Sequence, residues 1–565
     1  MAMQQISLEQ VFVEQAEYIE DESFTRWSAS HPDEEAILRK LTHGGAKLIS
    51  GPRGCGKTTL LKKAFQKLIC DDDAAFPIYV NYKRSLSIEP VYAAGKNGTY
   101  WFHQWIILKI YQGIYHSLKE LKNCTQLSIS LRKAKESSDY LEMSNSAKVE
   151  SETVSIGKLE EDILRVLEKT GRTRCVLLLD DAAHAFSPDQ QRDFFDFFRQ
   201  IKSKEISPKA AIYPGVTNYS SSFHVGHDAE QIDVWIKPER DEYLEFMRRI
   251  IEARFPEDIE KKITQNAAAV DLLCYASFGV PRALLNMLQS LIVESGEQDL
   301  AAIDFSRSSV LKAIKHHFAS TKKLFLSLTG KIPVYKKFIE TGDYILGNSF
   351  DLIKTYNKNK VDIKQSVAIA VPDNEMSPEL MRVFALFQYA GLCIPKDELV
   401  SRGEKGRFRI FTMHYAGIVD ANALLGAKSI NVQAYVRSFA QRDAHEFTRT
   451  RPRALMAGAV LSDAFALSLP PCSACGAPRP FEEAQFCAKC GSPLTLSSTY
   501  LNLMNSDIAE LPLTEARVKK IKEQSSIRKV KDILMDLEHS QLLQVDRIGK
   551  IWAAKIVGLA EEFVE

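Results

Sequence analysis

The sequence predicts an α/β fold built on a doubly wound parallel sheet, followed by a helical region and several smaller modules. Short apolar segments alternate with amphipathic segments between about residues 45 and 236, the pattern of strands joined by crossover helices. CVLLLD (175–180) is apolar almost throughout, as a strand buried on both faces should be. Glycine-rich GPRGCGKTT (51–59) separates the first strand from the first helix, a place where such sheets bind ligands.

The elements follow in a regular order along the chain. Strands are predicted within THGGAKLIS (42–50), FPIYVNY (76–82), RCVLLLDDA (174–182), KAAIYPGVTN (209–218) and AEQIDVWI (229–236). Residues 132–157 are polar and aperiodic, and are predicted to form an exposed irregular insertion. Residues 240–315 are predicted to be helical, 316–460 mixed and 500–565 helical.

Composition limits the classes of protein to which the chain can belong. The 565 residues carry a formal net charge of +1, so any contact with nucleic acid must come from a local basic face. No apolar run approaches the ~20 residues of a membrane span, and the first residues lack a signal-peptide pattern. Six of the ten cysteines are scattered singly, which is typical of reduced thiols. We therefore expect a cytoplasmic protein without a membrane partner.

The glycine-rich segment matches the phosphate-binding pattern G-x-x-x-x-G-K-[ST], with a strand before it and a helix after it. Backbone N–H groups of such a loop surround phosphate oxygens, and the following helix directs its positive dipole end at the same charge. We expect Lys57 to reach the β- and γ-phosphates of ATP and Thr58 to ligate Mg²⁺. The predicted nucleotide-binding set is Gly51, Pro52, Arg53, Gly54, Cys55, Gly56, Lys57, Thr58, Thr59 and Asp180.

Two carboxylates end the third predicted strand. Asp180 is expected to hold Mg²⁺, and Asp181 to orient or deprotonate the attacking water. The alternative is that either residue only caps the helix that follows. Together with the phosphate loop, the pair predicts an ATPase, an enzyme that hydrolyses ATP.

ISGPRGCGKTTLL, LLLDDA and FGVPRALL together resemble an AAA+ P-loop ATPase of the origin-recognition (ORC-like) initiator type, of which bacteria carry many relatives. The resemblance covers about residues 10–320. It implies that Arg282 is the sensor-2 arginine that reaches the γ-phosphate from a helical lid, and that Thr217 or Asn218 is sensor 1. The alternative for Gly279–Arg282 is a helix start with proline near its first position.

The sequence departs from this family in two ways. YSSSFHVGHDAEQ (219–231), where an arginine finger is usual, contains no arginine, and the next one is Arg240. Asp181 also stands where glutamate is commoner, and its shorter reach favours slow hydrolysis. The departures leave a homo-oligomer open and put catalysis in trans in doubt.

ORC-like ATPases usually carry a winged helix after the lid. ELMRVFALFQYAGLCI (379–394) is expected to hold its recognition region, and KDELVSRGEKGRFRIFTMH (396–414) its wing, with Arg402, Lys405, Arg407 and Arg409 near the hairpin. An ordinary solvated hairpin is the alternative.

Cys472, Cys475, Cys487 and Cys490 follow the spacing C-x2-C-x11-C-x2-C. Four thiolates make a closed tetrahedral site, and Zn²⁺ is its usual occupant. Gly476 and Gly491 follow directly, where positive φ lets backbone amides point at the sulfur atoms. The prediction is a structural zinc ribbon; disulfides and an iron–sulfur cluster are the alternatives.

The last residues resemble the helix-hairpin-helix fold found at the C-terminus of the RNA polymerase alpha chain, through ELPLTEARVKKIK, SIRKVKDIL and LLQVDRIGKIWAAKI. The resemblance implies that Gly549 and Lys550 approach a DNA phosphate, and Arg517, Lys519 and Lys520 belong to a local basic surplus that suits a phosphate track. The DNA-contacting arginine of that polymerase domain falls on Ala516, and Arg547 replaces a common glycine. Docking to a protein, or solvation of a basic helix face, is the alternative.

Together these features predict five regions: an AAA+ core (1–240), a helical lid (241–320), a winged-helix or mixed domain with an Arg-rich connector (321–465), a zinc ribbon (470–495) and a helix-hairpin-helix module (500–565). The favoured function is an ATP-controlled switch that contacts DNA through its backbone with weak sequence specificity. The resemblance to bacterial proteins of this build implies a setting in a mobile element or in anti-phage defence. The alternative is a signalling NTPase whose C-terminal modules recruit a protein partner or effector. No clustered carboxylates or Cys/His arrangement indicates a separate nuclease or other effector enzyme.

Overall fold

The computed structural model describes residue 19 and residues 21–564, except 84, 95–96, 144–152, 183–186, 256–260, 264, 292–302, 359, 361–364, 397, 402–405, 425–431, 441–446, 460–462, 470, 473, 480–483, 485, 493, 495–498 and 537. Two cations of the predicted wing, Arg402 and Lys405, thus lie outside the described residues. None of the helices in the described part of the chain has both the length and the apolar character needed to cross a membrane.

A five-stranded parallel sheet forms the centre of the first region, with the order β2-β3-β4-β1-β5. Its strands are β1 (Lys47–Ser50), β2 (Phe76–Asn81), β3 (Cys175–Asp180), β4 (Ile206–Ile212) and β5 (Glu230–Asp233). Because β4 lies between β1 and β3, the carboxyl ends of these three strands meet at one edge of the sheet. The predicted α/β class and the predicted parallel sheet are confirmed.

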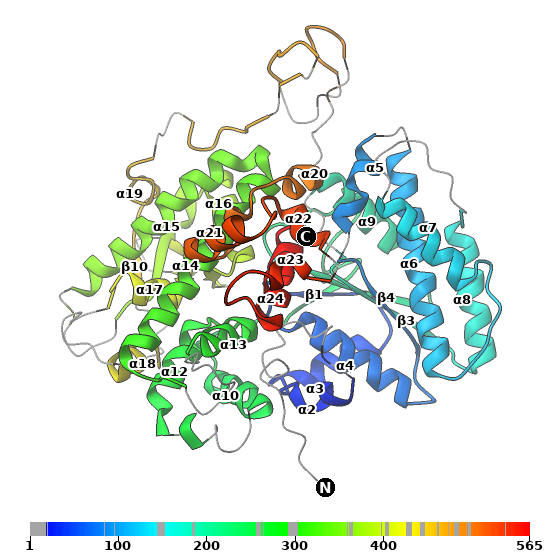
Figure 1. The fold of residues 1–565 in the computed structure, drawn as a ribbon, viewed down its shortest axis with the longest axis horizontal. Helices are drawn as coiled ribbons and strands as arrows, with labels where there is room; N and C mark the ends of the chain where they lie inside the picture. Colours follow the sequence, from blue (N-terminus) through cyan, green and yellow to red (C-terminus); the bar gives the residue numbers. More distant parts are fainter. Residues whose placement is uncertain are drawn as a thin grey trace.

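Helices cover both faces of this sheet (Figure 1). Alternate strand residues face opposite sides, so Leu48 and Leu177 enter one apolar layer while Ile49 and Leu178 enter the other. The helices of the first region are α2 (Asp21–Trp27), α3 (Glu34–Thr42), α4 (Lys57–Cys70), η2 (Ser85–Ile88), α5 (Glu89–Ala94), α6 (Gly98–Glu120), α7 (Leu131–Met143), α8 (Ile156–Thr170) and α9 (Pro188–Gln200).

Helix α7 corrects the expected irregular insertion at 132–157. Its buried residues, Ala134, Ser138 and Leu141, recur at helical spacing and form a narrow stripe. Gln112 on α6 donates a hydrogen bond to the Ser138 hydroxyl at 2.8 Å, which ties the two helices together.

A helical region follows and packs beside the sheet. It consists of α10 (Tyr243–Arg254), α12 (Ala267–Ala276), α13 (Pro281–Ser290) and α14 (Arg307–Lys331). Gly279, with φ +78°, precedes α13, and a Cβ at this position would lie 2.0 Å from the Ile236 carbonyl oxygen. Glycine therefore allows the start of α13 to lie against the chain that leaves β5.

A second sheet belongs to the next region. The elements are η3 (Pro333–Tyr335), α15 (Lys336–Asn357), β6 (Ala368–Pro372), η4 (Asp373–Glu375), α16 (Pro378–Tyr389), β7 (Cys393–Pro395), β8 (Val400–Ser401), β9 (Arg407–Met413), α17 (Tyr415–Asp420), α18 (Val432–Ala440), β10 (Thr448–Arg449) and α19 (Pro452–Leu455). β9 pairs antiparallel with β6, β7 and β8, and β10 pairs parallel with β6. Helix, strand, helix and antiparallel hairpin follow in the order of a winged helix.

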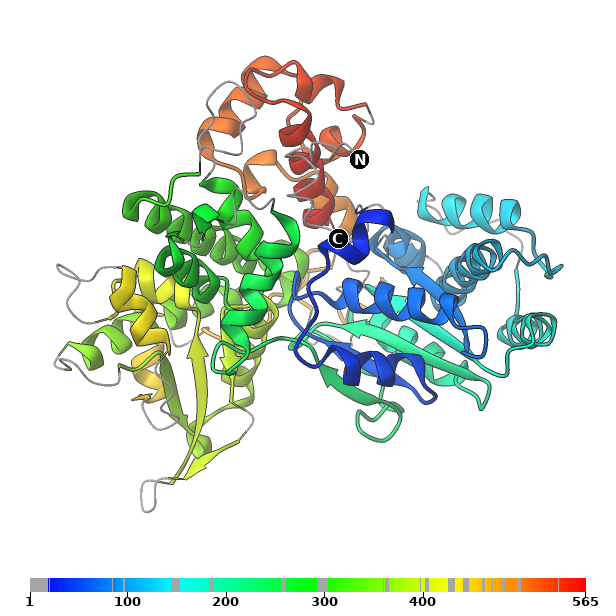
Figure 2. The same ribbon diagram turned by 90° about the horizontal axis from the view of Figure 1, so that it is seen from below.

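The last region is a small helical module that lies over the junction between the sheet domain and α13–α14 (Figure 2). It contains α20 (Thr499–Met504), η6 (Ile508–Glu510), α21 (Glu515–Gln524), α22 (Val530–Leu534), α23 (Ser540–Leu543) and α24 (Lys550–Val564). Its buried residues Ile521, Ile533 and Ile556 belong to the same apolar core as the residues of α12–α17. Arg547, before α24, has φ +65°, so the side chain that replaces the expected glycine sits on left-handed backbone.

Candidate nucleotide site and metal centre

The loop between β1 and α4 has the backbone geometry of a phosphate cradle. Gly54 and Gly56 have φ values of +81° and +101°, and α4 begins at Lys57. A Cβ on Gly54 would lie 2.9 Å from the Arg282 Cβ atom, so glycine also allows the loop to contact α13. The loop is thus positioned between the sheet and the helical region.

Lys57 lies at the base of this loop and is 5% exposed. Its Nζ donates hydrogen bonds to the carbonyl oxygens of Gly51 (2.7 Å) and Pro52 (3.1 Å), and lies 3.9 Å from the centre of the Tyr213 ring. Burial lowers the pKa of Lys57. A phosphate would give this ammonium group the counter-charge that carbonyl oxygens supply only in part.

The carboxylates at the end of β3 differ in environment. Asp180 is fully buried, and its oxygens accept hydrogen bonds from the Tyr79 hydroxyl (2.9 Å) and the Asp181 amide (3.1 Å). Asp181 has φ +51° and accepts a 2.6 Å hydrogen bond from the Tyr213 hydroxyl. Burial, and then the charge of Asp181, raises the pKa of Tyr213 well above its usual range, so this hydroxyl stays protonated and holds the carboxylate.

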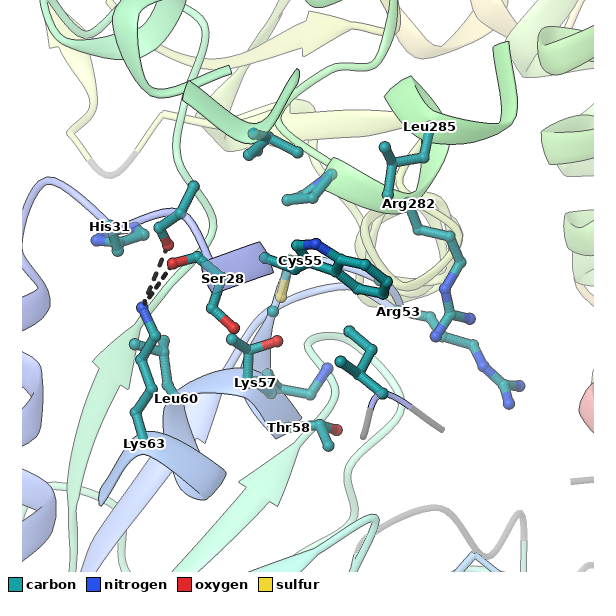
Figure 3. A pocket seen from close by; sticks show the side chains of 18 of the residues that line it. Ser28, His31, Arg53, Cys55, Lys57, Thr58, Leu60, Lys63, Arg282 and Leu285 are labelled. Atoms are coloured by element: carbon teal, nitrogen blue, oxygen red, sulfur yellow. Dashed lines mark hydrogen bonds between the residues drawn. The ribbon is translucent and has the colours of Figure 1, made fainter. Parts of the chain in front are cut away.

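One pocket brings together several of the predicted residues (Figure 3). Lys57, Asp181 and Arg282 line it, from the loop, the end of β3 and α13 respectively. In Figure 3 the side chains of Arg53 and Arg282 extend beside each other at one end of the pocket. The other predicted residues that line it are Arg53, Gly54, Cys55, Gly56, Thr58 and Thr59.

Thr217 and Asn218 do not belong to this lining. The Thr217 hydroxyl donates to the Tyr213 carbonyl at 2.7 Å, and the Asn218 amide donates to Gln191 at 2.7 Å and to the Val216 carbonyl at 3.0 Å. Tyr213 reaches the pocket instead. Its place directly after the fourth strand is the sequence signal that could have indicated it.

Apolar and aromatic side chains also line the pocket, and no sequence motif indicated them. Trp27, Phe246 and Ile250 line it. Arg254 of α10 donates to the Trp27 carbonyl at 3.1 Å. Lys63 of α4 binds the Glu34 carboxylate at the start of α3 at 2.6 Å. These contacts hold α2 and α3 against α10 and α4. Apolar and aromatic side chains of this kind suit the flat ring system of a nucleotide.

Arg240, the first arginine after the expected finger interval, forms an ion pair with Asp33 of the same chain. Arg240 Nη2 lies 3.2 Å from Asp33 Oδ1, in addition to the contact made by Nη1. The Arg240 guanidinium group thus links the chain after β5 to the amino-terminal segment that carries Asp33.

Helix α16, within the predicted recognition region, packs against the end of β4. A Cβ on Gly215 would lie 1.9 Å from the Ala385 carbonyl oxygen, and the Tyr213 and Tyr389 rings lie 5.8 Å apart. In the wing, Arg409 binds Asp373 at 2.6 Å. The winged helix is therefore docked next to the pocket through the helix that was expected to face DNA.

The four clustered cysteines converge as their spacing predicts. The ligand atoms of Cys472, Cys475, Cys487 and Cys490 all lie within 4.8 Å of one another. Each pair closes the same turn, in which the amide of Gly476 or Gly491, with φ near +70°, donates to the first cysteine's carbonyl. The closest sulfur pairs are 3.6 Å apart, near the ~3.8 Å that Zn–S bonds of about 2.3 Å give in a tetrahedron.

The predicted DNA-contacting residues of the last module are partly engaged within it. The Arg517 guanidinium lies 3.4 Å from the centre of the Trp552 ring, and Lys519 lies 3.8 Å from Glu523. Lys520 is half-buried on the same helix, whereas Gly549 and Lys550 are exposed at the start of α24.

No family model matches this sequence. No curated protein matches it either. Among solved structures, the fold is similar to the ORC1 protein of Aeropyrum pernix in complex with DNA (14% identity, TM-score 0.30, 70% of this chain and 93% of that one). It is also similar to a Walker-type ATPase of Pyrococcus abyssi (14%, 0.36, 69% and 94%) and to Cdc6p from Pyrobaculum aerophilum (12%, 0.30, 75% and 98%).

Proposed function

We propose that the protein binds and slowly hydrolyses ATP, and that it acts as a nucleotide-controlled switch of the ORC-like AAA+ type. The observation that carries this proposal is the pocket lined by Lys57, Asp181 and Arg282, which apolar and aromatic side chains also line. These residues come from three separate elements, which is the arrangement that lets a bound nucleotide fix the helical region against the sheet domain.

In this site the loop amides would hold the phosphates, and Lys57 would leave the Gly51 and Pro52 carbonyls for phosphate oxygens. Thr58 and Asp180 would hold Mg²⁺, which neutralises charge that develops on the phosphates during transfer. The two donors on Asp180 fix the orientation of its carboxylate for that role. Asp181 would accept a proton from, or orient, the attacking water after giving up its bond from Tyr213.

The cysteine cluster fits Zn²⁺, since four sulfur atoms at tetrahedral spacing leave no open position. We assign it a structural role, because a segment of about 20 residues cannot bury enough apolar surface to fold alone.

DNA is the ligand proposed for the exposed start of α24, through contacts of Gly549 and Lys550 with backbone phosphates. Capture of a protein partner is the second candidate, favoured by the engagement of Arg517 with Trp552 and by the docking of α16 on β4. The setting in a bacterial mobile element or an anti-phage defence system rests on the family resemblance alone.

The deciding experiment is ATP turnover with and without random duplex DNA at low salt, with Lys57→Ala as control. Stimulation by DNA that disappears in the variant supports the switch. Turnover that depends on Lys57 but ignores DNA supports the second candidate. Turnover that Lys57→Ala leaves unchanged contradicts the assignment of the site.

A further inference from the structure

A carboxylate from α24 binds cations that line the candidate nucleotide site. Arg282 donates through Nη1 to Glu562 Oε1, and Arg53 Nε lies 3.9 Å from the same oxygen. Arg53 Nη1 and Lys331 Nζ also lie 3.3 and 3.1 Å from the Glu562 carbonyl oxygen. Two of these cations, Arg53 and Arg282, line the nucleotide pocket itself.

A neighbouring pair extends the same contact. Lys83, which also lines the pocket, binds the Glu561 carboxylate at 3.1 Å. Four cations from four separate elements thus surround the last turn of α24. The cations are Arg53 on the loop, Lys83 after β2, Arg282 on α13 and Lys331 at the end of α14.

We propose that Arg53, Lys83, Arg282 and Lys331 form an anion site whose internal ligand is Glu562, and that the terminal phosphates of a nucleoside triphosphate compete with Glu562 for it. ATP binding then withdraws the end of α24 from the sheet domain. This inference rests on the proposed function, because it describes the regulation of the same pocket.

The charges that surround Glu562 favour an anion at this position. Its side chain is only 22% exposed, and burial by itself raises the pKa of a carboxyl group. The pKa of Glu562 nevertheless lies below its usual value, because the charges of Arg282, Arg53, Lys83 and Lys331 together outweigh the burial. The carboxylate therefore remains ionised when it is inserted.

The geometry imitates a phosphate group. The carboxylate and the main-chain carbonyl of Glu562 present oxygen atoms to three cations, and the carbonyl end of a helix adds partial negative charge. Guanidinium groups bind carboxylates and phosphates with the same planar fork. A triphosphate carries more charge than one carboxylate, so it competes well for the same four cations.

The remaining contacts of α24 explain why displacement matters. Lys555 donates to Asn286 (3.2 Å) and Gln289 (2.6 Å) on α13, while the contacts of Arg53 and Lys83 tie the same helix to the sheet domain. The helix thus bridges the two bodies whose angle a nucleotide would set. With Glu562 inserted, Arg282 cannot make the same contact with a phosphate.

The test compares the full-length protein with Glu562→Gln, which keeps the shape and removes the charge. Glu523→Gln, on an exposed ion pair of α21 in the same module, is the matched control. We measure the dissociation constants of a fluorescent ATP analogue and of AMP, and the hydrogen exchange of residues 550–564. Losing one charged hydrogen bond predicts roughly 10- to 100-fold tighter binding of the triphosphate in Glu562→Gln. The dissociation constant of AMP, which has no terminal phosphates to compete with Glu562, should change less than about twofold.

In the wild-type protein, the ATP analogue should accelerate exchange in residues 550–564, and Glu562→Gln should show fast exchange before nucleotide is added. This second readout uses unmodified protein, so it stands even if the variant folds poorly. Equal triphosphate affinities in wild type and Glu562→Gln, or slower exchange of α24 on adding ATP, overturn the inference while leaving Lys57-dependent binding intact. If neither the wild-type protein nor Glu562→Gln binds nucleotide in a way that depends on Lys57, the proposed function is wrong, and this inference, which rests on it, is wrong as well.

Discussion

Replacing Gly215 with alanine should loosen the contact between the nucleotide site and the winged helix. Gly215 has φ +80°, and an added Cβ would lie 1.9 Å from the carbonyl oxygen and 2.5 Å from the carbonyl carbon of Ala385 in α16. Both atoms belong to a helix backbone, which no rotamer change can move away. The whole of α16 must therefore shift by more than 1 Å, on the order of the gap to an ordinary contact distance.

The magnitude follows from two separate costs. Left-handed backbone costs alanine about 1 kcal/mol, and inserting a methyl group into a packed contact typically costs a further ~1–3 kcal/mol. Gly226→Ala isolates the first cost, since Gly226 has φ +91° and no atom within 4 Å of the added Cβ. The difference of ~1–3 kcal/mol between the variants corresponds to roughly 5- to 150-fold faster hydrogen exchange across α16, provided that this helix opens locally.

The assay is hydrogen exchange followed by mass spectrometry on peptides from residues 378–389, with peptides from β3 as an internal reference. We expect Gly215→Ala to accelerate exchange in α16 and Gly226→Ala to leave it near the wild-type rate. Equal exchange of α16 in the two variants would refute the close backbone packing of Gly215 on Ala385, and with it the mechanical link from β4 to the winged helix.

Three further outcomes are expected. Cys475→Ser should abolish stoichiometric zinc binding, measured by atomic emission, because the cluster is closed by thiolates alone. The dissociation constant for ATP should stay within about twofold of the wild-type value. Loss of nucleotide binding in this variant would show that the zinc ribbon belongs to the ATPase core. Asp181→Asn should lower turnover by about 100-fold or more at nearly constant ATP affinity, as removal of a proton acceptor does, and a turnover within threefold of wild type would contradict that role. Burial lowers the pKa of His317 to about 4. The stability that depends on its neutral form is therefore fully present above the pKa of the unfolded state, near 6.5. Up to about 3 kcal/mol of the free energy of unfolding is lost as the pH falls from 6.5 to 4. His317→Phe should reduce the fall of the urea midpoint across that pH window, and an unchanged fall would contradict the role of His317. The fall that remains belongs to other groups, among them His414, whose pKa burial also lowers.

Local spacing made much of the nucleotide site and the cysteine cluster predictable. The glycine-rich loop and the paired cysteines each depend on residues within about 20 positions, and both spacings correspond to a single backbone geometry. The positive φ values of Gly54, Gly56, Gly476 and Gly491 are what those spacings require. Sequence is sufficient where the chemistry is local.

Other features could not be predicted, for identifiable physical reasons. Helix α7 gives a weak signal because its buried stripe contains Ala134 and Ser138, small residues that carry little hydrophobic character. Thr217 and Asn218 have the polar side chains expected of a sensor, whereas Tyr213 reaches the pocket because the strand ends one residue before it. The contact between Arg282 and Glu562 joins two residues that are far apart in the sequence, and only the tertiary fold brings them together.

The contact between Arg53 and Glu562 spans 509 positions of sequence. Closing so long a loop costs little more free energy than closing one half as long, since the entropy grows with the logarithm of length. Its effect is on the order of events: contacts of such high sequence separation form after local ones. During refolding there should thus be an interval in which the glycine-rich loop is complete and Glu562 has not yet arrived. A nucleotide that is present in that interval can bind before Glu562 competes for the site. ATP should therefore bind faster when it is present during refolding than when it is added to the folded protein. Stopped-flow fluorescence of the ATP analogue measures both rates.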